Sequence, residues 1–228
     1  MRRWVGAALW TMLLAGGAAA DDVPDPRWSV LETAGPVKVS SRGQWRALGS
    51  DRVVAQGAWL KTGTRGRVVL ERDGVRIEVR PGSLVAVAGL ADDPGMTVLM
   101  QRWGETALDV EPRARPRVKV HTPFMASVVK GTRFEVSVDR CYTAMRVVEG
   151  RIAVEDAPRG QATEIVSGQS AGAGRGPANG MRVEGAGARA PVTTIPKASG
   201  AVPGLARNEV VTPQNVFEPA MRLPRRPS

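Results

Sequence analysis

Aromatic residues are scarce in this sequence of 228 residues, which has six tryptophans, one tyrosine and three phenylalanines. Valine, glycine and alanine dominate the apolar set, and this composition favours many short strands and turns over long helices. No window keeps apolar residues at spacings of three and four for long enough to predict a helix. After the N-terminal segment, no apolar run is long enough to span a bilayer.

Cysteine and histidine are almost absent, with Cys141 and His121 the only examples. An intramolecular disulfide is therefore excluded, and the fold must depend on packing alone. One histidine and one cysteine do not supply the three or four ligands of a zinc site, so no metal is expected. We predict that Cys141 is a partly buried small apolar residue, with an intermolecular bridge or a reactive thiol as the alternative. His121 alternates with Val118 and Val120, so we predict that it faces solvent.

Sequence motifs of catalysis are also missing, since there is no phosphate-binding P-loop and no Gly-x-Ser-x-Gly element. A thiol-dependent enzyme using Cys141 with His121 is a further hypothesis, but residues 139–142 resemble no known nucleophile context. We therefore predict a protein that is not an enzyme and that needs no cofactor.

The first twenty residues have the pattern of a secretory signal peptide. Two arginines precede an apolar stretch over residues 4–15, and Ala18 and Ala20 fit the Ala-x-Ala cleavage rule. An uncleaved anchor is the alternative, but the stretch is shorter than the roughly 20 residues that a spanning helix needs. We expect residues 1–20 to be removed and the chain to be periplasmic or otherwise exported.

The net charge is +10, and it is unevenly distributed. Residues 159–228 contribute +5, from nine basic and four acidic residues, whereas residues 21–158 contribute only +3. A basic tail on an exported protein suggests anionic envelope surfaces or acidic protein partners. Nucleic acid is not expected as a partner, because the tail does not interleave basic with aromatic residues and no recognition helix or zinc pattern is present.

Between Trp28 and about Val166, short apolar runs alternate with turn residues. Apolar and charged residues alternate in residues 75–79, which is typical of a strand with one buried face. Asp73-Gly74 predicts a hairpin because glycine tolerates the positive φ that such a turn needs, and Glu149-Gly150 gives a second hairpin signal.

We therefore predict an all-β fold, a compact solenoid-like or roll-like stack of about a dozen short strands, with a β-sandwich as the alternative. Residues 21–49 should lead into a domain over residues 50–170, followed by a mostly disordered basic tail over residues 171–228. Near its end, residues 208–228 recover some apolar pattern, either as a docking peptide or as a frayed terminus. The predicted core consists of strand residues that are apolar: Val75, Ile77, Val79, Val118, Val120, Phe134, Val136, Val147, Ile152 and Val154.

The sequence resembles the FecR domain family in two blocks within residues 50–170. Residues 57–63 and 68–79, which include Asp73 and Gly74, resemble the first half of that domain. The second block is stronger because it combines several short motifs in order: Thr122-Pro123, Gly131-Thr132 followed by Phe134, Glu149-Gly150, and residues 166–169. We assign these motif residues a structural role, in which Gly131 permits a bulge or a close backbone approach.

The resemblance implies a periplasmic all-β domain that works by protein contact, without cofactor or catalysis. In founding members of the family, such a domain receives a signal from an outer-membrane transporter and passes it to a cytoplasmic sigma factor. Here the apolar segment begins at Trp4, where founding members have a cytoplasmic anti-sigma segment. We therefore do not expect direct contact with a sigma factor.

Two functional hypotheses follow from these features of the sequence. The first is a non-enzymatic periplasmic interaction or sensory-scaffold module with an envelope protein as its partner. The alternative is a cell-envelope module that binds peptidoglycan or another anionic glycan through the basic residues of one loop and strand, namely Arg113, Arg115, Arg117 and Lys119.

Overall fold

The computed structural model describes residues 27–187, except residues 42, 50–51, 90–92, 94, 114, 116, 157 and 176–179, together with residues 193–194. These residues form strands and loops and contain no helix, so none of the described chain could cross a membrane as a helix. The predicted signal segment 1–20 and residues 195–228 of the predicted tail lie outside the described residues.

The prediction of an all-β fold is confirmed, and the described residues form eighteen strands rather than about a dozen. In chain order they are β1 (Trp28–Ala34), β2 (Val37–Ser41), β3 (Gln44–Ala47), β4 (Val53–Val54), β5 (Trp59–Thr62), β6 (Arg67–Arg72), β7 (Val75–Val79), β8 (Leu84–Gly89), β9 (Thr97–Val110), β10 (Val118–His121), β11 (Ala126–Val129), β12 (Thr132–Val138), β13 (Tyr142–Glu149), β14 (Arg151–Asp156), β15 (Gln161–Val166), β16 (Gln169–Gly174), β17 (Arg182–Gly185) and β18 (Thr193–Thr194).

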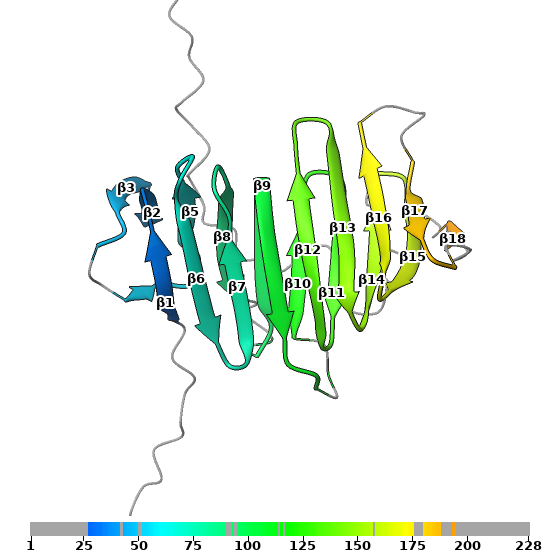
Figure 1. Ribbon diagram of the computed structural model, residues 1–228, viewed down its shortest axis with the longest axis horizontal. Helices are drawn as coiled ribbons and strands as arrows, with labels where there is room; N and C mark the ends of the chain where they lie inside the picture. The colour runs from blue at the N-terminus through cyan, green and yellow to red at the C-terminus, as the bar shows by residue number, and fades with distance from the viewer. Residues whose placement is uncertain are drawn as a thin grey trace, which may run out of the picture.

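The strands lie in two facing layers (Figure 1). The front sheet, as seen in that view, contains β1, β4, β6, β7, β12, β13, β16 and β17. The back sheet contains β2, β3, β5, β8, β10, β11, β14, β15 and β18. The chain crosses repeatedly between the two sheets as it advances along the stack, which is the predicted solenoid-like arrangement.

The long strand β9 belongs to both layers. Residues 97–103 pair with β8 and residues 97–100 also pair with β10, whereas residues 104–110 pair with β12 and residues 106–110 also pair with β7. The strand changes layer at Gly104, whose φ of 91° is open to glycine but strained for other residues. A Cβ at this position would lie 2.2 Å from the hydroxyl oxygen of Ser83, so the bend also requires the absence of a side chain.

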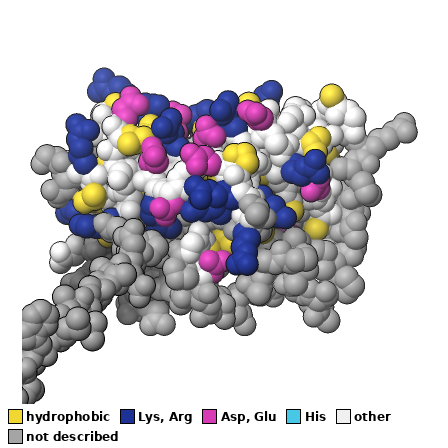
Figure 2. Space-filling view, turned by 90° about the horizontal axis from the view of Figure 1, so that it is seen from below, with side chains coloured by type: hydrophobic (Ala, Val, Ile, Leu, Met, Phe, Trp, Pro, Cys, Tyr) yellow, Lys and Arg dark blue, Asp and Glu magenta, His cyan; other side chains and the backbone are white. Residues whose placement is uncertain are grey.

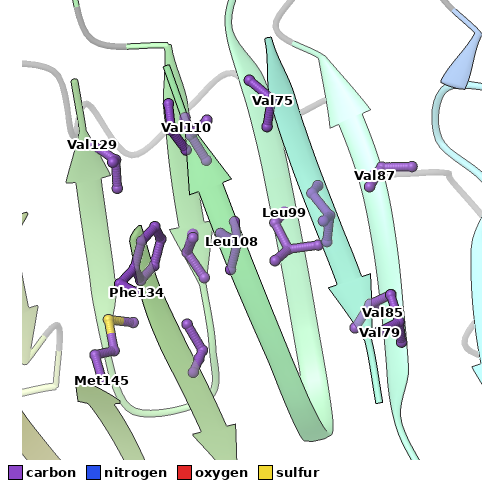
Figure 3. Packing of buried hydrophobic residues seen from close by; sticks show 14 of the residues in the cluster. Val75, Val79, Val85, Val87, Leu99, Leu108, Val110, Val129, Phe134 and Met145 are labelled. Carbon is purple, nitrogen blue, oxygen red and sulfur yellow. The ribbon is translucent and has the colours of Figure 1, made fainter. Parts of the chain in front are cut away.

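The core lies between the two sheets and is built from the inward-facing residues of each strand. In β7, buried Val75, Ile77 and Val79 alternate with exposed Arg76 and half-buried Glu78, as the period of two predicts. Figure 3 shows this packing, with Phe134 and Met145 among the valines and leucines of neighbouring strands. All ten residues of the predicted core are buried.

One of the two predicted hairpins is wrong. Asp73 and Gly74 both have positive φ, 52° and 75°, and they join the paired strands β6 and β7 as predicted. Glu149-Gly150 also forms a tight turn, but β13 pairs with β12 and β16 whereas β14 pairs with β11 and β15. The turn carries the chain from the front sheet to the back sheet, because a local turn motif does not determine which strands pair after it.

The predicted start of the tail at residue 171 is also wrong, since β16 continues to Gly174 and β17 follows it at Arg182. Ala171 and Ala173 lie in the core, and β16 pairs with β13 over residues 170–174. The small residues that suggested low complexity fit here because a Cβ at Gly172 would lie 2.0 Å from the Tyr142 hydroxyl oxygen. Close packing therefore selects glycine and alanine in this strand.

Candidate functional site

Several motif residues meet in a structural joint at the lower end of the stack in Figure 1, where β11 leads into β12. A Cβ on Gly131 would lie 2.2 Å from Cα of Pro112, so the loop after β9 passes directly over this glycine. The Thr132 hydroxyl donates to the carbonyl oxygen of Arg151 at 2.8 Å, which ties β12 to the start of β14. Gly150, with a φ of 96°, completes the joint beside Thr132.

The Asp73–Gly74 turn fastens the same loop. The carbonyl oxygen of Asp73 accepts a hydrogen bond from Nη1 of Arg117 at 2.6 Å, and the carbonyl oxygen of Gly74 accepts one from the amide of Glu111 at 2.9 Å. These contacts are backbone-directed and hold the loop in place. The arrangement is architectural.

The four basic residues proposed as glycan contacts do not form one exposed patch. Arg113 and Arg115 are exposed, but Arg113 lies 3.4 Å from the Glu111 carboxylate. Arg117 is half-buried against the Asp73 turn, and Lys119 is only 9% exposed. Figure 2 views this end of the stack and shows basic and acidic side chains intermingled on its described surface.

His121 is half-buried, so the prediction that it faces solvent is wrong. Burial lowers the pKa of its imidazole, and the positive charge of Lys119 lowers that pKa further. The alternation in β10 placed Val118 and Val120 correctly in the core, but it could not show that the opposite side of this strand is also shielded.

At the upper end of the stack in Figure 1, the Thr122-Pro123 motif forms a tight turn between β10 and β11. The Thr122 hydroxyl oxygen accepts a hydrogen bond from the amide of Met125 at 2.9 Å. The Thr143 hydroxyl oxygen lies 3.0 Å from that of Thr122, which links the turn to the front sheet. This turn holds Pro123 and Phe124 at the rim of a groove.

The groove has a volume of about 770 Å³ and collects residues from four separate segments of the chain. We call it the arginine–tryptophan groove. Its lining consists of Arg102, Trp103, Gly104, Pro123, Phe124, Val138, Asp139, Arg140 and Arg175. Trp103 is 43% exposed although it is a large apolar side chain, and it lies at the bend where β9 changes sheets.

Positive charge predominates in this groove. Arg102, Arg140 and Arg175 are all exposed, and Asp139 is the one acidic residue in the described lining. The Asp139 carboxylate accepts hydrogen bonds from the amides of Cys141 and Tyr142, both at 2.7 Å, so it is engaged in the turn between β12 and β13. The groove therefore offers guanidinium groups beside an aromatic ring, which suits an anionic ligand with an apolar part.

Cys141 lies in the turn next to this groove and is exposed, so the prediction that it is partly buried is wrong. The residue lies between β12 and β13, in a turn that projects into solvent at the end of the stack, so it is not packed as a small apolar residue would be. His121 lies on a different element, at the end of β10. The described residues contain no group of three histidine, cysteine or acidic side chains that could hold a metal ion.

The sequence did not reveal the groove because its members come from distant positions. Arg102-Trp103 and Phe124 are the residues that could have suggested it, since each lies at the point where an apolar run breaks. Their meeting depends on the bend of β9 and on the parallel pairing of β9 with β10. Neither feature has a local sequence signature.

Comparison with known proteins gives one family match and a remote structural likeness. Residues 58–153 match the family described as FecR protein. Two crystal structures of a proposed anti-sigma factor from Parabacteroides distasonis, at 2.50 and 1.65 Å resolution, each resemble the chain with a TM-score of 0.49 at 13% sequence identity. The similarity covers 57% of this chain and 60% of each of theirs. No curated protein matches the sequence.

Proposed function

Because this chain carries a FecR domain over residues 58–153, we propose that it is a non-enzymatic interaction or sensory-scaffold module of the cell envelope. It works by contact with a protein partner. The signal-like residues 1–20 support a periplasmic or otherwise exported location.

The observation that carries this proposal is the arginine–tryptophan groove. Tryptophan and arginine are the residues most enriched among those that dominate binding energy at protein interfaces. Here exposed Trp103 lines the groove together with exposed Arg102, Arg140 and Arg175. An acidic peptide segment with an aromatic or aliphatic side chain would bury the indole and place its carboxylates near the guanidinium groups.

The test is capture of partners from a periplasmic extract by the immobilised chain. Trp103→Ala should abolish capture of a specific protein, because truncating an interface tryptophan commonly costs about 2 kcal/mol or more of binding energy. Trp45→Ala is the matched control. Trp45 is equally exposed at 43%, but it lies in β3, an edge strand of the back sheet that contributes no residue to the groove. We expect the Trp45→Ala chain to capture the partner protein as the native chain does, and the Trp103→Ala chain to fail to capture it.

Salt dependence supplies a second reading of the same experiment. Binding through exposed arginines weakens as ionic strength rises, because salt screens charges on the scale of about 10 Å at 0.1 M.

Equal capture by the native chain and Trp103→Ala would overturn the assignment of the groove. Sedimentation of the native chain with purified cell wall, in the absence of any captured protein, would favour the glycan-binding alternative instead.

A further inference from the structure

The back sheet has a second apolar surface on the side that faces away from the core. In β8 and β9, Val85, Val87 and Leu99 point into the core, so their neighbours along each strand point outward. Those outward neighbours are apolar, and Ala88, Val98 and Met100 belong to a cluster separate from the core. Ala126 and Val128 of β11 form a second such cluster. We call this surface the outer band; it consists of Trp59, Ala86, Ala88, Val98, Met100, Ala126 and Val128.

The outer band is continuous across five strands. Trp59 pairs with Ala86, and Ala86 pairs with Met100, in one row of cross-strand neighbours. In the next row, Ala88 pairs with Val98, Val98 with Lys119, and Lys119 with Val128. The band therefore runs from β5 through β8, β9 and β10 to β11.

All of these side chains except the half-buried Met100 are shielded from solvent although they point away from the core. Val98 is 0% exposed and Trp59 is 3% exposed. Every described strand belongs to one of the two sheets, so no described strand or helix is layered over this side of the back sheet. An antiparallel sheet with one solvated face normally carries polar residues there, so an apolar band requires an apolar cover.

We propose that the C-terminal segment of the same chain, residues 208–223, docks on the outer band. This segment contains six large apolar side chains, namely Val210, Val211, Val216, Phe217, Met221 and Leu223. The residues between it and the sheet are rich in glycine, alanine and proline and offer no comparable group. On docking, Glu218, next to Phe217 in the sequence, would supply a carboxylate to Lys119, the one ammonium group paired within the band.

The path of the chain favours this occupant. The last described strand, β18, pairs with β15 in the back sheet, so the chain leaves the fold from the same layer that carries the band. Residues 195–207 lie between β18 and the segment, and 13 extended residues span up to about 43 Å. Crossing β15 and β14 to reach β11 requires only about 15 Å, at roughly 4.8 Å per strand.

Tethering also favours this segment over a free partner. A peptide linked by a short flexible connection has an effective concentration in the millimolar range at its site. A second copy of the chain or an external protein must compete against that concentration.

The experiment measures how fast a thiol in the outer band reacts with a water-soluble disulfide reagent. The variant is Ala88→Cys in a Cys141→Ser background, in chains that span residues 21–228. The rate is compared with that of the same variant ending at residue 204, which keeps every described strand, and with that of Phe217→Asp. Removing or disrupting the segment should accelerate the reaction on the order of tenfold or more, because the thiol then becomes accessible without local opening.

The native cysteine supplies the control. Cys141 is exposed and lies at the end of the stack, so truncation after residue 204 should leave its reaction rate unchanged. Circular dichroism of each variant establishes that the sheet is intact. Equal rates in the full-length and truncated Ala88→Cys chains would overturn the proposal, as would protection that rises with protein concentration, which would assign the cover to a second copy.

Discussion

Gly131 is the residue over which the loop after β9 passes, and the absence of a side chain there allows this close approach. Its position under Pro112 leaves no room for a methyl group, because the nearest atom would be a backbone carbon at 2.2 Å. Gly131→Ala should therefore lower the free energy of unfolding by about 1–3 kcal/mol, the range expected for overpacking. Urea unfolding followed by circular dichroism measures this change.

Gly49→Ala is the control for that prediction. A Cβ at Gly49 would meet nothing within 4 Å, and its φ is not in the left-handed region. This substitution should leave the unfolding free energy within about 0.5 kcal/mol of the native value. If both alanine variants behave alike, the close approach at Gly131 does not constrain the fold.

At the scale of elements, β14 and β16 are joined across the two sheets by a buried carboxylate. Asp156 is fully buried at the end of β14, and its Oδ2 lies 2.8 Å from Nη1 of Arg159. Nη2 of the same guanidinium donates to the carbonyl oxygen of Gly174 at 3.1 Å, at the end of β16. Arg159 therefore holds the β14–β15 turn against the front sheet.

Arg159→Leu should destabilise the fold by about 3 kcal/mol, because it leaves a buried carboxylate without its partner. The double variant Asp156→Leu with Arg159→Leu should recover part of that loss, since no charge then remains buried. Arg151→Leu is the comparison, because its pair with Glu164 is exposed and contributes under about 1 kcal/mol. Equal urea midpoints for Arg159→Leu and Arg151→Leu would contradict this account.

Strand positions and the core could be predicted from the sequence because alternation is local. Val75, Ile77 and Val79 needed no knowledge of their partners. Strand pairing after Glu149-Gly150 could not be predicted in this way, since the turn leads to β14 in the other sheet. The arginine–tryptophan groove is less predictable still, because it depends on the bend of β9 at Gly104.

At the scale of the whole molecule, the pH dependence of the unfolding free energy near neutral pH should report on one side chain, because His121 is the only histidine in 228 residues. Burial, together with the charge of Lys119, lowers the pKa of the imidazole in the folded chain. The unfolded chain, with a histidine pKa of about 6.5, therefore binds the proton more readily. Folding stability is fully present above that pKa and falls as the pH drops toward the lower pKa of the folded state.

His121→Gln removes this contribution and should flatten the dependence of unfolding free energy on pH between about 7 and 5. In the native chain the histidine contributes a slope of at most about 1.4 kcal/mol per pH unit, the limit for one proton. Urea unfolding at a series of pH values compares the native chain with His121→Gln. Carboxylates titrate mainly below this pH range, and they do so equally in both chains. An unchanged slope in His121→Gln would show that the imidazole is as solvated in the fold as in the unfolded chain. The back sheet near β10 would then be open to water, whereas a flattened slope agrees with the shielding seen along the outer band.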